Sequence, residues 1–243
     1  MRMLTFSRRC AKEILRDRLN LCFGLGFPLV LLVLLSAIQA NIPVDLFEIH
    51  RLTPGIAVFG RSFMTLFSAT LIARDRESAF LQRLYTTPLT GLDFILGYML
   101  PLLPISLGQT LTVYLAAIPL GLTVSPGMVY AVVGSIPMAV FQIGLGLLCG
   151  SLLGVKQVGG LCGALLTNVS AWLSGVWFDL KLVGGLFERI AYALPFVHGV
   201  ELERALFCGE LSQAVERLPV ILLYSLAATA LAAWCFLRQM NKQ

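Results

Sequence analysis

Residues 94–155 read FILGYMLPLLPISLGQTLTVYLAAIPLGLTVSPGMVYAVVGSIPMAVFQIGLGLLCGSLLGV, which is 62 residues without an Asp, Glu, Lys or Arg. A helix needs about 20 apolar residues to cross the hydrocarbon core of a bilayer. The stretch is therefore too long for one crossing. Its only turn-rich group near the middle is GLTVSPG at 121–127. We expect two membrane spans that are joined by this turn.

The composition of the whole chain indicates the same class. Of 243 residues, 58% are hydrophobic and 13% are charged, whereas a soluble domain carries about 25% charged residues. Further charge-free stretches cover 19–44, 157–178 and 218–237. These features predict an integral membrane protein and exclude a soluble enzyme, a DNA-binding protein and a disulfide-stapled secreted domain.

The predicted fold is an all-α integral membrane protein, with one domain over residues 1–243 and six transmembrane helices. The spans are expected at about 21–40, 53–73, 94–120, 128–153, 158–178 and 219–237.

Positive charge predicts the orientation, because Lys and Arg collect on the cytoplasmic side of membrane proteins. With six spans, twelve Lys and Arg residues lie on the side of the two termini and five lie on the other side. We therefore expect both termini in the cytoplasm of a protein of the bacterial inner membrane. The same bias accounts for the net charge of +5 without nucleic acid. The six cysteines form no CxxC pair and no His stands at ligand spacing, so we expect no metal site.

The N-terminal segment, residues 1–19, is expected to form an amphipathic helix. At 100° per residue, one arc holds the apolar side chains, and charged residues occupy the rest. Such a helix lies in the headgroup plane of a bilayer. The alternative is a plain basic anchor for the first span. The apolar arc consists of Leu4, Ala11, Ile14 and Leu15.

The loop at 74–91 combines dense charge with an apolar helical repeat. Phe80 and Leu84 recur at helical spacing, and Pro88 ends the helix. A short helix of this kind can dock into a groove on a cytoplasmic partner. It can equally bury Phe80 in lipid, and the residues alone leave both readings open.

The loop between the fifth and sixth predicted spans is not plainly polar. Residues 182–207 hold two apolar-periodic pieces that Pro195 separates, and each piece is too short to span. We expect re-entrant or interfacial helices on the outer surface. Glu201 and Arg204, on the polar face of the second piece, are the candidate residues of an outer gate.

Polar residues inside the predicted spans are few, and an intramembrane charge is a functional hypothesis by default. Arg61 either pairs with a carbonyl or carboxylate to hold spans together or takes part in substrate passage. Gln109, Gln142 and Asn168 are the other candidates for the substrate path, with hydrogen bonding between helices as the simpler alternative.

A glycine repeat marks the fourth predicted span. Gly146, Gly150 and Gly154 stand four residues apart. This spacing is typical of helices that approach each other closely. We expect a crowded helix–helix contact along this face.

Three segments resemble the permease subunits of type-2 ABC exporters, the group that includes drug, polysaccharide and Nod-factor exporters. They are RLYTTPLTGLDFILGY at 83–98, LTPGIAVFG at 52–60 and LPFVHGVELERALFCGE at 194–210. The resemblance covers nearly the whole chain. Where the family often has a Lys near the start of the third span, this chain has Tyr98.

The resemblance implies a coupling helix in the 74–91 loop, a connecting helix at the N-terminus and outer re-entrant helices at 182–207. It also implies a working unit of two permeases, as a homodimer or heterodimer, and two cytoplasmic ATPase subunits. ATP and Mg would bind to those partners, because this chain has no GxxxxGK[ST] motif and no cofactor is expected on it. The residues implied in coupling are Arg76, Glu77, Phe80, Arg83, Leu84 and Pro88.

The resulting hypothesis is the permease half of an ATP-driven exporter for a hydrophobic or amphiphilic substrate, of the drug, lipid or glycan type. The chain itself has no catalytic residues on this reading. The predicted spans hold no carboxylate, which argues against proton-coupled transport. One alternative is a secondary transporter or channel. The other is a membrane anchor that recruits a cytoplasmic partner.

Overall fold

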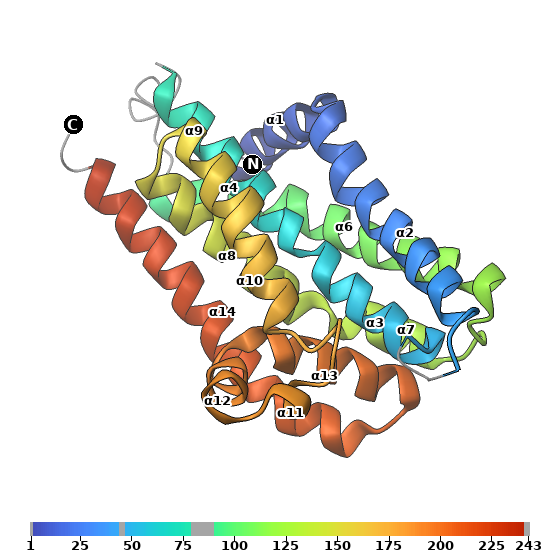
Figure 1. Cartoon of the computed structure of the whole chain (residues 1–243). Helices are drawn as coiled ribbons and strands as arrows, with labels where there is room; N and C mark the ends of the chain where they lie inside the picture. Colours follow the sequence, from blue (N-terminus) through green and yellow to red (C-terminus); the bar gives the residue numbers. More distant parts are fainter. Residues whose placement is uncertain (1, 44–46, 79–89, 241–243) are drawn as a thin grey trace.

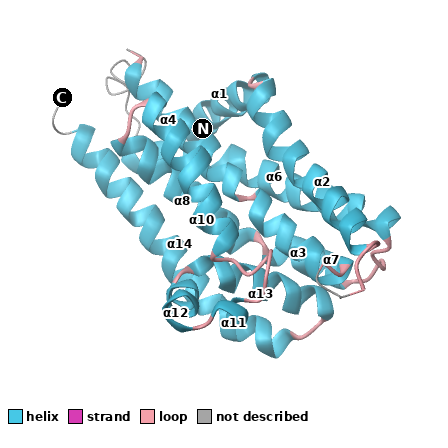
Figure 2. Cartoon of the chain, viewed as in Figure 1, coloured by secondary structure: helices cyan, strands magenta, loops and turns pink. Residues whose placement is uncertain are grey.

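The computed structural model describes residues 2–43, 47–78 and 90–240, and all regular elements in these ranges are helices (Figures 1 and 2). Five helical segments are long and apolar enough to cross a membrane, and they coincide with five of the six predicted spans. The all-helical prediction is thus confirmed. The five segments are Arg18–Gln39, Ile49–Glu77, Asp93–Leu120, Gly127–Leu152 and Leu211–Arg238.

Two short breaks divide the first third of the chain. Asp17 separates the first two helices, and its carboxylate accepts a hydrogen bond from the Asn20 N–H at 3.3 Å, which caps the second helix. A turn at Arg61 separates the third helix from the fourth within one predicted span. The helices of this part are α1 (Arg2–Arg16), α2 (Arg18–Gln39), α3 (Ile49–Gly60), α4 (Ser62–Glu77) and α6 (Gly91–Ala117).

The second part of the chain begins at the predicted turn 121–127, which is confirmed. Gly121 ends the preceding helix with φ 107°, a conformation that glycine adopts without strain. The elements are η1 (Ile118–Leu120), α7 (Gly127–Gly134), α8 (Ile136–Leu152), α9 (Val155–Val158), the π-helix η2 (Gly159–Leu166), α10 (Thr167–Trp172), α11 (Leu180–Val183), α12 (Gly185–Ala193), α13 (Pro195–Cys208) and α14 (Leu211–Met240).

The fifth predicted span, 158–178, differs from expectation. In place of one long α-helix, the chain forms α9, η2 and α10 in succession and leaves the helix after Trp172. Glycines at 159, 160 and 163 weaken the α-helical preference. In the π-helical turn the Thr167 hydroxyl donates to the Cys162 carbonyl at 3.0 Å. A sixth span is therefore not established by helix length.

α8 lies at the centre of the bundle and packs against α4 on one side and α14 on the other (Figure 1). The predicted crowding is confirmed at two of the three glycines. A Cβ atom at Gly146 would overlap the Thr65 carbonyl oxygen, and one at Gly150 would overlap the Ala69 carbonyl oxygen. Glycine is required at both positions because the obstacle is backbone.

α1 forms the predicted amphipathic helix, but it buries a different face. Phe6, Cys10 and Ile14 are its buried apolar side chains, and they pack toward α6. Leu4 and Leu15, which belong to the predicted apolar arc, are exposed. Of the predicted arc only Ile14 is buried in the bundle, and the prediction missed Phe6 and Cys10 because one sequence could not show the helix that α1 packs against. The predicted end at residue 19 was also late, because Asp17 breaks the helix.

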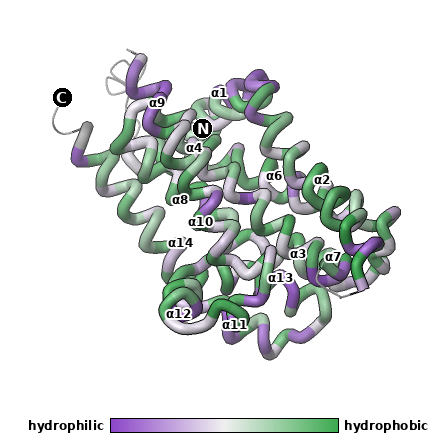
Figure 3. Tube along the Cα trace, viewed as in Figure 1, coloured by the Kyte–Doolittle hydropathy of each residue, from purple (hydrophilic) through white to green (hydrophobic). Residues whose placement is uncertain are grey.

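The two ends of the bundle differ in content. α1 and both chain termini lie at one end, and α11, α12 and α13 gather at the other (Figure 1). Hydrophobic residues run along most of α2 and α14, and hydrophilic residues collect on α1 (Figure 3). The predicted division at Pro195 is confirmed, because α12 ends at Ala193 and α13 begins at Pro195.

Candidate functional site

An open cavity of about 550 Å³ lies between α2, the α3–α4 pair and the η2–α10 segment. Four pairs of its rings stand with centroids 5.6–6.2 Å apart, within the range of favourable aromatic contacts. The cavity offers ring faces and edges to an apolar or cationic ligand. Its aromatic lining consists of Phe23, Phe27, Phe59, Phe63, Trp172 and Trp177.

Two polar side chains, Thr167 and Asn168, also line this cavity. The Asn168 amide nitrogen donates to the Ala164 carbonyl at 2.8 Å. A largely aromatic wall with a few polar groups is typical of a small-molecule site. Asn168 is the one predicted path residue that lies in this lining.

Arg61 is fully buried and faces the interior of the protomer. Its Nη2 forms an ion pair with Glu203 Oε2, and its Nη1 donates to Thr110 Oγ1 at 2.8 Å. The side chain of Glu203 is only 2% exposed. The pair joins the α3–α4 break to α13 and to α6. Of the two readings of Arg61, this geometry supports the structural one.

The two glutamines are buried between helices as well. Thr65 Oγ1 donates to Gln142 Oε1 at 2.6 Å, which links α4 to α8. Gln109 is buried against Gly60, where a Cβ atom would overlap the Gln109 amide nitrogen. Within the described residues, neither its amide nitrogen nor its amide oxygen has a hydrogen-bond partner. The structure thus places Gln109 and Gln142 in helix contacts and not in the aromatic cavity.

The predicted outer-gate residues lie on α13 but do not pair with each other. Glu201 accepts a hydrogen bond from the Tyr192 hydroxyl at 3.0 Å and forms an ion pair with Arg217 at 3.0 Å. Arg204 donates to the Arg51 carbonyl at 3.1 Å. Burial and the neighbouring Arg51 charge lower the pKa of Arg204 to about 10. Both residues line a cavity of about 320 Å³.

At the opposite end, a charged cluster fastens α1 to the bundle. Both terminal nitrogens of Arg9 donate to the Asp75 carboxylate at 2.6 Å, and the Tyr98 hydroxyl donates to the same group at 2.8 Å. Burial lowers the pKa of Arg9, but hydrogen bonding and the charge of Asp75 outweigh it, so the pKa lies above its ordinary value. A bidentate pair of this kind fixes both position and orientation. The cluster connects α1 to the end of α4 and the start of α6.

Two of the residues implied in coupling make contacts inside the chain. Arg76 Nη1 donates to the Gly150 carbonyl at 2.8 Å, and Glu77 Oε1 accepts from the Val155 N–H at 2.8 Å. Both contacts hold the end of α4 against the α8–α9 junction. The other four, Phe80, Arg83, Leu84 and Pro88, lie outside the described residues.

Sequence reasoning missed two residues of this arrangement, Glu203 and Asp75. Glu203 was not among the candidate residues, yet it lies in a run of α13 where most side chains are buried. The available signal was apolar sequence on both sides, with Leu202 before it and Ala205 and Leu206 after Arg204. Asp75 was one charge among several in the 74–91 loop, and nothing local distinguishes it.

A family model for the ABC-2 type transporter matches residues 2–208, which is most of the chain. No curated protein sequence matches it. The match agrees with the apolar helical bundle and with the basic helix at its end. The chain therefore belongs to the ABC-2 type transporter family, as a multi-pass membrane permease that has no ATPase activity of its own.

Proposed function

We propose that this chain is the permease subunit of an ATP-driven exporter and that it moves a hydrophobic or amphiphilic substrate outward. The aromatic cavity between α2, α4 and α10 is the observation that carries this proposal. Its size suits a drug-sized ligand, for which pockets of about 300–1,000 Å³ are usual. Its Asn168 amide adds a polar group that can orient a headgroup or a cation.

The working unit in this proposal contains two permease chains and two ATPase subunits. Phe23 and Trp172 line the cavity and are both 60% exposed, so one wall of the cavity is open. A second copy of the chain against this face would close it and double the aromatic lining. ATP and Mg bind to the ATPase partners.

Six spans with both termini in the cytoplasm of the bacterial inner membrane complete the proposed topology. The α9–η2–α10 succession supplies 18 consecutive helical residues. Both termini lie at one end of the bundle in Figure 1, and an even number of crossings has this consequence. α11, α12 and α13 then form the outer re-entrant helices, with Glu201 and Arg204 at the outer gate.

The loop at 74–91 is proposed to hold the coupling helix, whose proposed residues are Arg76, Glu77, Phe80, Arg83, Leu84 and Pro88. Support comes from the helix that precedes it. α4 is held by Arg76, Glu77 and the Arg9–Asp75 pair, so a force on the loop would move α4, α1 and α8 together.

Replacing Trp172 with alanine is expected to reduce transport of a lipophilic fluorescent cation about tenfold. One ring contact contributes on the order of 1 kcal/mol beyond its apolar area. The measurement is the concentration dependence of dye efflux in cells that produce the permease together with its ATPase. Trp234→Ala is the matched control, since Trp234 is 55% exposed on α14 and does not line the cavity.

Equal efflux by Trp172→Ala and Trp234→Ala would contradict the assignment of the cavity. Asn168→Leu separates polar from apolar recognition. This variant should reduce the efflux of a cationic dye and leave the efflux of a neutral dye of similar size unchanged.

A further inference from the structure

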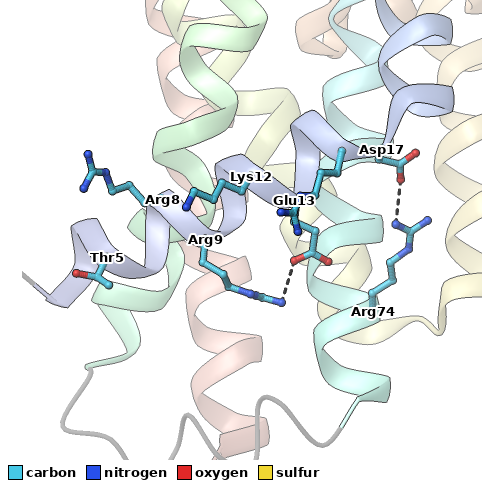
Figure 4. A pocket seen from close by; sticks show the side chains of 8 residues that line it. Thr5, Arg8, Arg9, Lys12, Glu13, Asp17 and Arg74 are labelled. Atoms are coloured by element: carbon cyan, nitrogen blue, oxygen red, sulfur yellow. Dashed lines mark hydrogen bonds and ion pairs between the residues drawn. The ribbon is translucent and has the colours of Figure 1, made fainter.

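Another cavity, of about 960 Å³, lies over α1 and is basic (Figure 4). Two carboxylates, Glu13 and Asp17, belong to its lining. The cations of the lining outnumber these carboxylates. The cations are Arg8, Arg9, Lys12, Arg16 and Arg74.

The two carboxylates are already paired. Arg9 contacts Glu13 at 2.8 Å, and Arg74 contacts Asp17 at 2.9 Å (Figure 4). Arg9 also binds Asp75 behind the cavity. These pairs offset the charges of Arg9 and Arg74, so the excess charge of the cavity comes from the other three cations.

Those three, Arg8, Lys12 and Arg16, stand four residues apart on α1, and we call them the basic stripe. All three are exposed, and no ion pair involving any of them is found in the ranges that the structure describes. Residues four apart lie on one side of a helix. The stripe therefore presents three neighbouring cations to an anion from outside the chain.

Exposed leucines stand directly beside the stripe. At about 100° per residue, Leu4 falls about 40° from Arg8, and Leu15 falls about 20° from Arg8 and about 60° from Lys12. Leu4 and Leu15 are 53% and 62% exposed. Leu19, near the start of the candidate membrane span α2, is also exposed. A small soluble anion would make no apolar contacts with these leucines. A ligand with a phosphate head and acyl chains matches both groups at once.

We propose that this cavity binds the headgroup of an anionic phospholipid from the leaflet in which α1 lies. The basic stripe contacts the lipid phosphate, and Leu4 and Leu15 contact the upper part of the acyl chains. The proposed orientation decides only which leaflet supplies the lipid, and with both termini in the cytoplasm this is the cytoplasmic leaflet. Because Arg9 and Arg74 tie the same cavity to Asp75 and to α4, the bound lipid also stabilises the attachment of α1 to the bundle.

Native mass spectrometry of the purified full-length permease in detergent tests this inference without the ATPase or a transported substrate. The probes are phosphatidylglycerol, phosphatidylcholine and glycerol 3-phosphate. Phosphatidylglycerol should bind at least tenfold more tightly than phosphatidylcholine. Arg8→Gln with Lys12→Gln should weaken it about 25-fold, since one cation near a membrane surface corresponds to about fivefold in affinity. The matched control is Lys181→Gln with Arg189→Gln, two exposed cations at the other end of the bundle.

Three outcomes would overturn the proposal. The first is equal affinity for the two lipids, and the second is equal binding by the two double variants. The third is binding of glycerol 3-phosphate as tight as that of the whole lipid, which would identify a site for a soluble anion. Leu4→Ser with Leu15→Ser should weaken phosphatidylglycerol and leave glycerol 3-phosphate unchanged. Because no partner takes part, a failure here leaves the exporter proposal untouched, and the reverse also holds.

Discussion

Replacing Glu203 with alanine is expected to destabilise the permease so strongly that little folded protein is recovered on purification. Arg61 is fully buried, and Glu203 is its carboxylate partner. Without that partner the guanidinium stays inside the protein with only the Thr110 hydroxyl as an acceptor. Breaking a buried ion pair from one side costs about 3–5 kcal/mol, which is a large part of the total stability of a protein. Thermal unfolding followed by size-exclusion fluorescence measures the loss.

Two comparisons test the cause of this effect. Arg61→Met with Glu203→Leu removes both charges and should recover most of the folded protein, since a buried pair replaced by apolar side chains is often tolerated. Glu201→Ala removes a half-exposed pair with Arg217 and should cost about 1 kcal/mol or less. If Glu203→Ala melts like Glu201→Ala, the buried pair does not have the role described here.

The second large effect is expected at the contact of α4 with α8. Gly146→Ala places a methyl group against the Thr65 carbonyl and the Ser68 side chain, so the two helices have to separate along their length. Overpacking usually costs about 1–3 kcal/mol, and an obstacle made of backbone puts this variant at the upper end. Thermal unfolding of the purified protein gives the value.

Gly26→Ala is the control for this variant. Gly26 also lies in a spanning helix, α2, but no atom stands within 4 Å of a Cβ placed there. It should unfold at the wild-type temperature or slightly above, because alanine favours helix more than glycine does. Equal stability of Gly146→Ala and Gly26→Ala would contradict the close packing.

Much of the fold could be predicted from the sequence, because membrane insertion depends on local composition. Charge-free stretches predicted four of the five segments, the fifth was expected at 53–73 despite Arg61, and the glycine repeat predicted a crowded contact on α8 but not its partner α4. The same reasoning expected one α-helix at 158–178. This prediction was wrong because a π-helix depends on a shift of the backbone hydrogen bonds, and no residue pattern predicts that shift.

The partners of charged side chains could not be predicted. Arg61 and Glu203 are 142 residues apart, and one sequence without contacts offers no way to join them. The buried residues of α1 could not be predicted for a related reason, since Phe6 packs on Phe94 and Tyr98 of α6, far away in the sequence. Of the path residues, Asn168 alone reaches the aromatic cavity. A polar residue in a span is a sign of a polar contact, and only the packing shows whether that contact lies inside or outside.

The contacts of Glu77 also change how coupling has to be tested. A substitution at Glu77 would break its bond to the Val155 N–H and disturb the α8–α9 junction, so a loss of ATPase binding would have two explanations. Phe80→Asp is the cleaner variant. Leu182→Asp is its control, since Leu182 is 78% exposed on α11 at the other end of the bundle.

The most direct test of the exporter is uptake of a lipophilic fluorescent cation into inside-out vesicles that contain the permease and its ATPase. We predict uptake that requires ATP, that disappears with a hydrolysis-deficient ATPase and with Phe80→Asp, and that persists with Leu182→Asp. Uptake that continues without ATP hydrolysis and follows an ion gradient would contradict the account and identify a secondary transporter.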